Sequence, residues 1–363
     1  MAAIGRILLI VVVFVVGAAV GAYFLVPAKA SKSASFSVDR PAQAVFGYLS
    51  NAPAGAQLAT GVTQTKIVSA ADNKVVSDVK FADGTTGQAI FVVTPKGDKS
   101  EVQMTLEQAL GPNPLERVDA ITGGKIAPLF ATASTEVTAD IAKNLPPGDP
   151  VGLPYELTNV TAKPFIYNEN CSPQDPGDIK EAVAQSLTGL APFLVRYHLT
   201  QDGPPLAVET GWDEAKKTYC FEIGYAFTGK APTKLYFGGV KVGQTPGGDA
   251  VKVHYTGTEE QVIPTYDKME SLIGAARLTR GVSFEVYNDN PSQSDVGSTN
   301  RDIYYMVSGD TAALARVAPA SAAAPPAAAS SAAPAAPASS AAPASAAPAA
   351  PASSAAPAAA PAG

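Results

Sequence analysis

The sequence predicts an α+β protein in four parts: an N-terminal transmembrane helix, two folded domains that mix strands with helices, and a disordered tail. Three observations support this. Residues 7–26 are almost wholly apolar, which is long enough for a bilayer-spanning helix. The segments 34–146 and 152–308 each contain both strand-like and helix-like hydrophobic patterns, as α+β domains do. Residues 309–363 consist mostly of Ala, Pro and Ser, a composition that cannot build a core.

Composition argues against several classes of function. The formal net charge is −6 and no basic cluster occurs, which is unlike a nucleic-acid-binding surface. Two Cys and two His are too few for a metal site of soft ligands, so we expect neither a metal nor a cofactor. In an exported domain, Cys171 and Cys220 can instead form a disulfide that closes a loop of about 50 residues.

Residues 1–33 are interpreted as a membrane anchor or a signal segment. Basic residues flank the apolar run on both sides, so the charge bias that orients a membrane helix is weak. Ala28-Lys29-Ala30 has the form of a signal-peptidase site, but a cleavable apolar region usually spans about 7–15 residues. We therefore expect an uncleaved, single-pass anchor in a bacterial inner membrane with the other domains in the periplasm. Cleavage is the alternative, and it leaves the domains exported as well.

The segment 34–146 begins with a strand pattern at Phe36 and Val38, and Pro41 then opens a short helix. Four further strands are predicted at 63–68, 74–81, 87–94 and 100–106. A long helix at 121–144 is predicted to close the segment. This is the order of the helix-grip fold. The string Ser-Val-Asp-Arg-Pro-Ala, followed by Val45 and Phe46, resembles the START-like (SRPBCC) family of polyketide cyclases and lipid-transfer domains.

That resemblance implies a ligand cavity, but the segment is shorter than such domains and has no catalytic cluster. A reduced domain that serves as a spacer or a partner surface is the alternative. The proline- and glycine-rich residues 146–150 then read as an interdomain linker.

Residues 152–308 repeat one order of elements twice. The first copy has predicted strands at 155–167, 206–212 and 218–228, with a helix from 177. The second has strands at 251–256, 283–289 and 301–307, with a helix that starts at a capping box at 258–261 or, alternatively, at Pro264. Two copies of strand-helix-strand-strand predict one pseudo-symmetric domain with a shared sheet.

This segment resembles the GyrI-like effector-binding domain, which also occurs on AraC- and MerR-type regulators. The matching pieces are Gly203-Pro204-Pro205, the runs 221–225, 248–253 and 265–267, the run Phe-Glu-Val-Tyr-Asn-Asp-Asn-Pro at 284–291, and the run 302–305. The likeness covers nearly all of the segment in the right order. No helix-turn-helix pattern precedes it, so transcriptional regulation is not expected.

Period-two alternation sorts the strand residues onto two faces. In the strand 283–289, Glu285 and Tyr287 lie opposite Phe284 and Val286. We assign the large apolar faces to the helices. The remaining faces are then expected to form one groove, lined by Glu209, Glu222, Glu285, Tyr287, Tyr304 and Met306. Such acids can also simply be solvated on an open sheet face.

Carboxylates on an aromatic bed suit an amphipathic cation, because aromatic faces attract cations by about 0.5–2 kcal/mol each. The GyrI-like resemblance implies that a Glu at the position of Glu285 contacts cationic ligands. We therefore expect a membrane-anchored small-molecule-binding protein. One alternative is a hydrolase of small electrophiles that uses Glu285 with Tyr287 or Tyr304 as acid and base. The other is a structural protein that binds an envelope partner through its tail.

Overall fold

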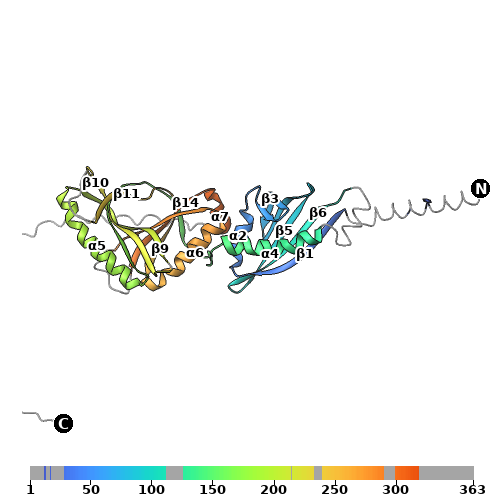
Figure 1. The fold of residues 1–363 in the computed structure, drawn as a ribbon, viewed down its shortest axis with the longest axis horizontal. Helices are drawn as coiled ribbons and strands as arrows, with labels where there is room; N and C mark the ends of the chain where they lie inside the picture. The colour runs from blue at the N-terminus through green and yellow to red at the C-terminus, as the bar shows by residue number, and fades with distance from the viewer. Residues whose placement is uncertain are drawn as a thin grey trace, which may run out of the picture. The chain divides into compact units, whose positions relative to one another are not determined.

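The structure is a computed structural model that describes residues 12–13, 17, 28–111, 126–213, 215–232, 239–289 and 299–318. Within these ranges the chain forms two antiparallel sheets with few helices (Figure 1), so the predicted α+β class is confirmed. Most of the expected anchor and nearly all of the expected tail lie outside the described residues. No helix among the residues that the structure describes is both long and apolar enough to cross a membrane.

The first sheet has six strands in the order β1-β6-β5-β4-β3-β2. Their bounds are β1 (Lys29–Val38), β2 (Gln57–Ala59), β3 (Val62–Ala71), β4 (Lys74–Phe81), β5 (Thr86–Lys96) and β6 (Lys99–Ala109). The helices are α2 (Ala42–Ser50) and α4 (Ile126–Asn144). One face of the sheet is buried against α4, where Phe91 and Met104 belong to the same core cluster as Ile141. The expected strand-helix-strands-helix order is present.

The anchor boundary predicted at residue 33 is wrong, because β1 begins at Lys29 and pairs along its length with β6. The first residues of this strand are Lys, Ala and Ser. They offer no apolar alternation, so the sequence pattern gives no strand signal there. Part of the predicted helix at 121–144 also lies outside the described residues, which begin again at 126.

The second sheet has eight strands in the order β11-β8-β10-β9-β13-β14-β12-β7. Their bounds are β7 (Tyr155–Val160), β8 (Pro164–Pro173), β9 (Thr200–Asp213), β10 (Thr218–Thr228), β11 (Val240–Gln244), β12 (Gly248–Gly257), β13 (Thr279–Tyr287) and β14 (Thr299–Ser308). The helices are α5 (Pro176–Arg196) and α6 (Ile263–Ala275). β8-β10-β9 and β13-β14-β12 mirror each other about the centre of the sheet. This is the strand order expected for two copies of strand-helix-strand-strand in one sheet.

Two details differ from the prediction, and a third decides between its alternatives. The expected strand at 155–167 is two strands, and they pair with different partners: β7 with β12, and β8 with β10. The edge strand β11 was not predicted. The helix of the second copy begins at Ile263, with Pro264 in its first turn, after a short 3-10 turn η1 (Glu259–Gln261). Of the two predicted helix starts, the one at Pro264 is right, because proline lacks the N–H that would go unpaired there.

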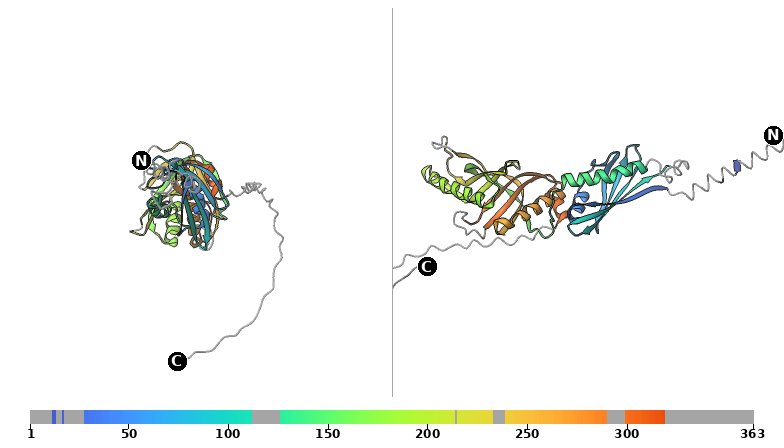
Figure 2. Two further views of the ribbon diagram at one scale, coloured as in Figure 1. Left: turned by 90° about the vertical axis from the view of Figure 1, so that its right-hand side faces the viewer. Right: turned by 60° about the horizontal axis from the view of Figure 1, so that its bottom comes forward.

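One hydrophobic cluster includes buried residues of both sheets. Helix α2 packs against α6 and against the short helix α7 (Leu314–Val317), and its Tyr48 and Leu49 join Ala275 and Leu314 in one buried cluster. Figure 2 shows α6 and α7 beside the first sheet's helices from a second direction. The predicted tail boundary at 309 is therefore wrong. Leu314 and Val317 are only two apolar residues, too short a pattern to read as a folded element.

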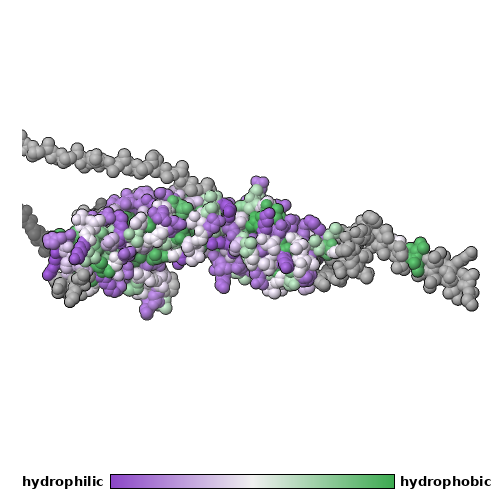
Figure 3. Space-filling view, turned by 90° about the horizontal axis from the view of Figure 1, so that it is seen from above, coloured by the Kyte–Doolittle hydropathy of each residue, from purple (hydrophilic) through white to green (hydrophobic). Residues whose placement is uncertain are grey.

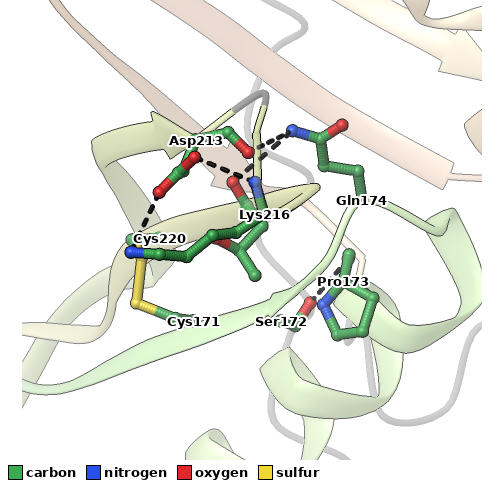
Figure 4. Close-up of a disulfide and its surroundings, with 8 residues drawn as sticks. Cys171, Ser172, Pro173, Gln174, Asp213, Lys216 and Cys220 are labelled. Carbon is green, nitrogen blue, oxygen red and sulfur yellow. Dashed lines mark hydrogen bonds and ion pairs between the residues drawn. A yellow bond between two sulfur atoms is a disulfide. The ribbon is translucent and has the colours of Figure 1, made fainter.

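A disulfide joins Cys171 of β8 to Cys220 of β10 (Figure 4). The two cysteines are direct partners in the strand register, with Cα atoms 4.0 Å apart. The pairing that the sequence allowed thus links two neighbouring strands.

Candidate ligand site on the second sheet

The helices α5 and α6 lie on the same side of the second sheet (Figure 1). Val183 and Leu187 of α5 pack on Phe221 and Ile223 of β10. On the other side of the sheet's centre, Met269 and other residues of α6 share a core with β12 and β14. The central strands β9 and β13 lie between these two contacts, so the nature of their side chains decides what this face can bind.

Polar side chains occupy this central face. They are Glu209, Tyr219, Ser283, Glu285, Tyr287, Arg301 and Tyr305, and we call them the polar stripe. The register explains why they meet. Ser283 lies directly opposite Tyr305, Tyr287 opposite Arg301, and Glu285 opposite Ala207 and Ile303, all on the helix side of the sheet. The middle of the second sheet is thus charged, whereas an apolar contact between the helices and the sheet is the usual arrangement.

At one end of the stripe the Arg301 guanidinium is enclosed. Its side chain is only 5% exposed. Nη1 donates to Oε2 of Glu285 at 2.6 Å, and Nη2 donates to Glu259. The cross-strand neighbours Tyr255 and Tyr287 present their rings with centroids 5.9 and 5.8 Å away. We call the residues Glu259, Glu285, Tyr255 and Tyr287 the arginine cage.

The surroundings in the cage fix the charge states of Arg301 and Tyr287. Burial disfavours the charged form of Arg301, but Glu285, Tyr287 and Glu259 outweigh it and raise the pKa of the guanidinium above its usual value. Burial, and then the neighbouring Glu285 charge, raise the pKa of Tyr287 well above its usual range. At neutral pH the cage therefore holds a cation beside a neutral phenol.

A small cavity adjoins the cage. Arg301, Tyr287, Glu259 and Thr299 line it from the sheet side, and residues of α5 close it. Its volume of about 20 Å³ has room for about one water molecule. The Nε atom of Arg301 is buried and has no hydrogen-bond partner among the described residues. The cavity is too small for an organic ligand unless side chains move.

The other end of the stripe is centred on Glu209. This half-buried carboxylate accepts a hydrogen bond from Ser283, and it forms no ion pair with a described residue. Burial, followed by the charges of Glu285 and Glu209, raises the pKa of Tyr219 well above its usual range. The Trp212 ring meets Tyr219 edge to face at 5.4 Å and is 51% exposed. An acid with only a neutral donor therefore lies beside an aromatic pair that reaches solvent.

Net charge around the stripe is negative. Among the described residues, four carboxylates, Glu209, Glu259, Glu270 and Glu285, stand against three cations, Arg280, Arg301 and Lys180, which leaves one negative charge in excess. Glu270 of α6 pairs with Arg280 and accepts a hydrogen bond from the Tyr305 hydroxyl at 2.9 Å. Glu270 pairs with Arg280, and Glu259 and Glu285 share Arg301, whereas Glu209 forms no ion pair with a described residue.

The structure splits the groove expected from the sequence. Glu209, Glu285 and Tyr287 lie on the helix side, whereas Glu222, Tyr304 and Met306 lie on the opposite face. The register fixes this: Tyr304 pairs with Phe284, Phe284 with Val208, and Val208 with Glu222. The expectation of one groove with all six residues is therefore wrong, and their ligand-binding roles remain predictions.

Two physical reasons explain the error. Alternation sorts residues within a strand but does not say which face of one strand matches which face of the next. An irregularity in the β9–β10 pairing between Cys220 and Phe221, opposite Gly211 and Glu209, also shifts the alternation of β9. This shift brings Trp212 opposite Tyr219, whereas strict alternation would place Trp212 on the same face as Leu206 and Val208.

The opposite face offers less to a ligand. The Phe284 and Tyr304 rings stack there at 4.4 Å, and Met306 is buried in the same small cluster. Because Glu285 and Tyr304 lie on opposite faces, they cannot act together as an acid and base pair. The other predicted pair, Glu285 with Tyr287, shares a face but is held in the arginine cage.

Sequence reasoning missed Arg301, Glu259, Tyr255, Tyr219 and Ser283 as site residues. A signal for Arg301 existed, since it alternates with Ile303 and Tyr305 in a predicted strand and thus places a charge on an apolar face. Glu259 had no such signal, because it reaches the cage from a turn that follows β12.

Other parts of the described chain are less suggestive. No group of His, Cys, Asp or Glu that could hold a metal ion occurs among the described residues. A cavity of about 320 Å³ lies beside α4, lined by apolar residues and by Gln57, Asp140 and Arg277. On the face shown in Figure 3, hydrophobic and hydrophilic residues are intermingled. The polar stripe is therefore the strongest candidate site.

No protein-family model matches the sequence, and the comparison with curated proteins finds no match. Solved structures do show similarity. A hydrolase from Listeria innocua has 13% identity and a TM-score of 0.32, over 42% of this chain and 91% of that one. The EcmrR C-terminal domain has 13% identity and a TM-score of 0.35, over 44% of this chain and 99% of that domain.

The di-domain ARO/CYC protein BexL, from the BE-7585A biosynthetic pathway, covers more of this chain. It has 9% identity and a TM-score of 0.25, over 79% of this chain and 90% of BexL. All three TM-scores are below 0.5, so the family resemblances stay predictions from the sequence motifs.

Proposed function

We propose that this chain is a membrane-anchored small-molecule-binding protein whose second sheet takes an amphipathic, cationic ligand at the polar stripe. The observation that carries the proposal is Glu209. It is a half-buried carboxylate whose hydrogen-bond partner is the neutral Ser283, and it lies in a site with one negative charge in excess. The cationic group of the ligand binds Glu209, and its apolar body rests on Tyr219 and Trp212.

The energetic terms favour this assignment. A carboxylate that is partly removed from water attracts a cation more strongly than one in bulk solvent. Each aromatic face adds about 0.5–2 kcal/mol of cation–π attraction. Glu285, the residue first expected to meet the ligand, already holds Arg301 at 2.6 Å. The ligand's charge is therefore assigned to Glu209.

Export of the domains is part of the proposal. The apolar run at 7–26 would tether the chain to a membrane. The disulfide between Cys171 and Cys220 supports an oxidising compartment such as the periplasm. Fractionation tests this, because the full chain should sediment with membranes and a chain lacking residues 1–27 should not. Equal sedimentation of both chains contradicts the anchor.

The ligand assignment is tested by calorimetric titration of the full chain, held in lipid nanodiscs, with lipophilic cations and their neutral isosteres. Glu209→Gln should weaken cation binding about tenfold or more, since a lost charge-assisted contact costs about 1.5–3 kcal/mol. Glu222→Gln is the matched control, because it removes the same charge on the opposite face of the sheet. Unchanged affinity in Glu209→Gln, or no affinity for any cation, contradicts the proposal. If the chain is instead a structural protein, it binds no cation, and deletion of 319–363 removes its envelope partner from a pull-down.

A further inference from the structure

The arginine cage has the chemistry of a receptor for an organic cation. Two carboxylates and two tyrosine rings converge on one buried positive charge, and that charge belongs to the chain itself. Removing Arg301 would leave Glu259 and Glu285 facing each other across a void. Two like charges in a buried site repel each other unless a cation separates them.

We propose that Arg301 is an intramolecular ligand that closes the cage to external cations, and that the empty cage is a guanidinium-binding site. Arg301 is then the residue that sets specificity on this sheet: with it in place, a cation can bind at Glu209 but not at Glu285. This inference rests on the proposed function in one respect, namely that the natural ligand binds at Glu209. The cage itself is defined by the contacts of Arg301.

Tethering explains why an external cation does not compete. Arg301 is fixed on β14 between its cross-strand neighbours Tyr255 and Tyr287. A group joined to its site by a short linker acts at an effective concentration of millimolar or more, and here the linker is a packed side chain. A free monovalent cation at micromolar concentration loses to it.

The geometry selects a guanidinium over an ammonium ion. Nη1 binds Glu285 while Nη2 binds Glu259, so the two carboxylates lie along different directions of one planar fork. A guanidinium offers donors along fixed directions, whereas an ammonium ion is a compact point charge. The buried Nε, which has no partner among the described residues, lies on the same side chain that lines the small cavity. An alkylguanidinium can extend along the path vacated by the arginine side chain.

Chemical rescue tests the proposal. Arg301→Ala removes the atoms that ethylguanidinium replaces, so the melting temperature of the full-length variant should rise with added ethylguanidinium. We expect a rise of about 5 °C at a hundredfold excess over Kd. Ethylammonium should not produce the rise, the unmodified chain should not respond, and the double variant Arg301→Ala with Glu285→Gln should lose the response. Equal responses to ethylguanidinium and ethylammonium, or none to either, overturn the proposal.

A second measurement uses the unmodified chain and does not depend on the folding of a variant. In the ¹⁵N spectrum of the arginine side chains, the Nε–H signal of Arg301 should exchange slowly and stay unchanged with millimolar ethylguanidinium. A shift or loss of this signal would mean that an external cation displaces Arg301, which overturns the proposal. The two proposals fail separately. If the unmodified chain binds no lipophilic cation but ethylguanidinium still raises the melting temperature of Arg301→Ala, the proposed function is wrong and the cage proposal holds.

Discussion

Arg277 connects the two sheets, and its removal is the sharpest test of their shared core. It follows α6 in the left-handed region, with φ of 54°, and its guanidinium lies 3.6 Å from the centroid of the Tyr48 ring on α2. Nε donates to the Tyr48 carbonyl oxygen at 2.8 Å, and Nη2 lies 3.9 Å from Asp140 of α4. One side chain thus contacts both helices of the first sheet.

The size of the effect of Arg277→Ala follows from these contacts. A hydrogen bond from a charged donor contributes about 1.5–3 kcal/mol, and a cation–π contact about 0.5–2 kcal/mol. The ion pair with the half-exposed Asp140 adds no more than about 1 kcal/mol. The contacts share one guanidinium, so they do not add fully. We expect a loss of about 3 kcal/mol in the free energy of unfolding.

Urea unfolding followed by circular dichroism measures this loss as a lower midpoint with an unchanged m-value. The matched control is Arg316→Ala. Arg316 also connects the two parts, through Asn51 at 2.8 Å, but it is 53% exposed, so its loss should cost less than about 1 kcal/mol. Equal small effects of both substitutions would refute the reasoning, as would separate transitions of the two sheets in the unmodified chain.

Further predictions concern stability. Replacing Cys171 and Cys220 together by Ser should cost about 4 kcal/mol on the loop-entropy model for a separation of 49 residues; urea unfolding with and without reductant checks this, and a loss under about 1 kcal/mol contradicts it. Gly224→Ala should destabilise the chain strongly, because the new Cβ would lie 1.9 Å from the Ile166 carbonyl oxygen, whereas Gly189→Ala meets nothing and should stabilise α5 by about 0.5–1 kcal/mol. Melting temperatures that move in the same direction for both glycine variants would count against this packing. Burial raises the pKa of Tyr48 from 10.0 to about 12, so the stability contribution of its neutral form is complete below pH 10 and is lost as the pH rises through 12. Unfolding from pH 9 to 12 should therefore show a fall that Tyr48→Phe reduces; an identical fall in both proteins speaks against it.

Much of the fold could be predicted because its patterns are local. Tyr219, Phe221, Ile223 and Phe227 alternate so regularly that the limits of β10 agree with the prediction. The duplicated order of elements followed from the same kind of pattern. The strand β11 and the helix α7 could not be predicted, because each is short and is held by contacts with distant parts of the chain.

The site could be predicted only in part. Alternation placed Glu285 and Tyr287 together on one face, and the register keeps them there. Whether Tyr304 or Tyr305 shares that face depends on the pairing of β13 with β14, which no local pattern specifies. The ion pair between Glu285 and Arg301 depends on the same register. The sequence therefore predicted that Glu285 is free to bind a ligand, whereas in the fold it binds Arg301.

A crystal structure of the full chain with a bound lipophilic cation tests the central claim most directly. The account predicts that the ligand's charged atom lies within about 4 Å of the Glu209 carboxylate, with its apolar body on Tyr219 and Trp212 and with Arg301 still in its cage. A ligand bound at Glu222 on the opposite face, or one that has displaced Arg301 from Glu285, would contradict the account.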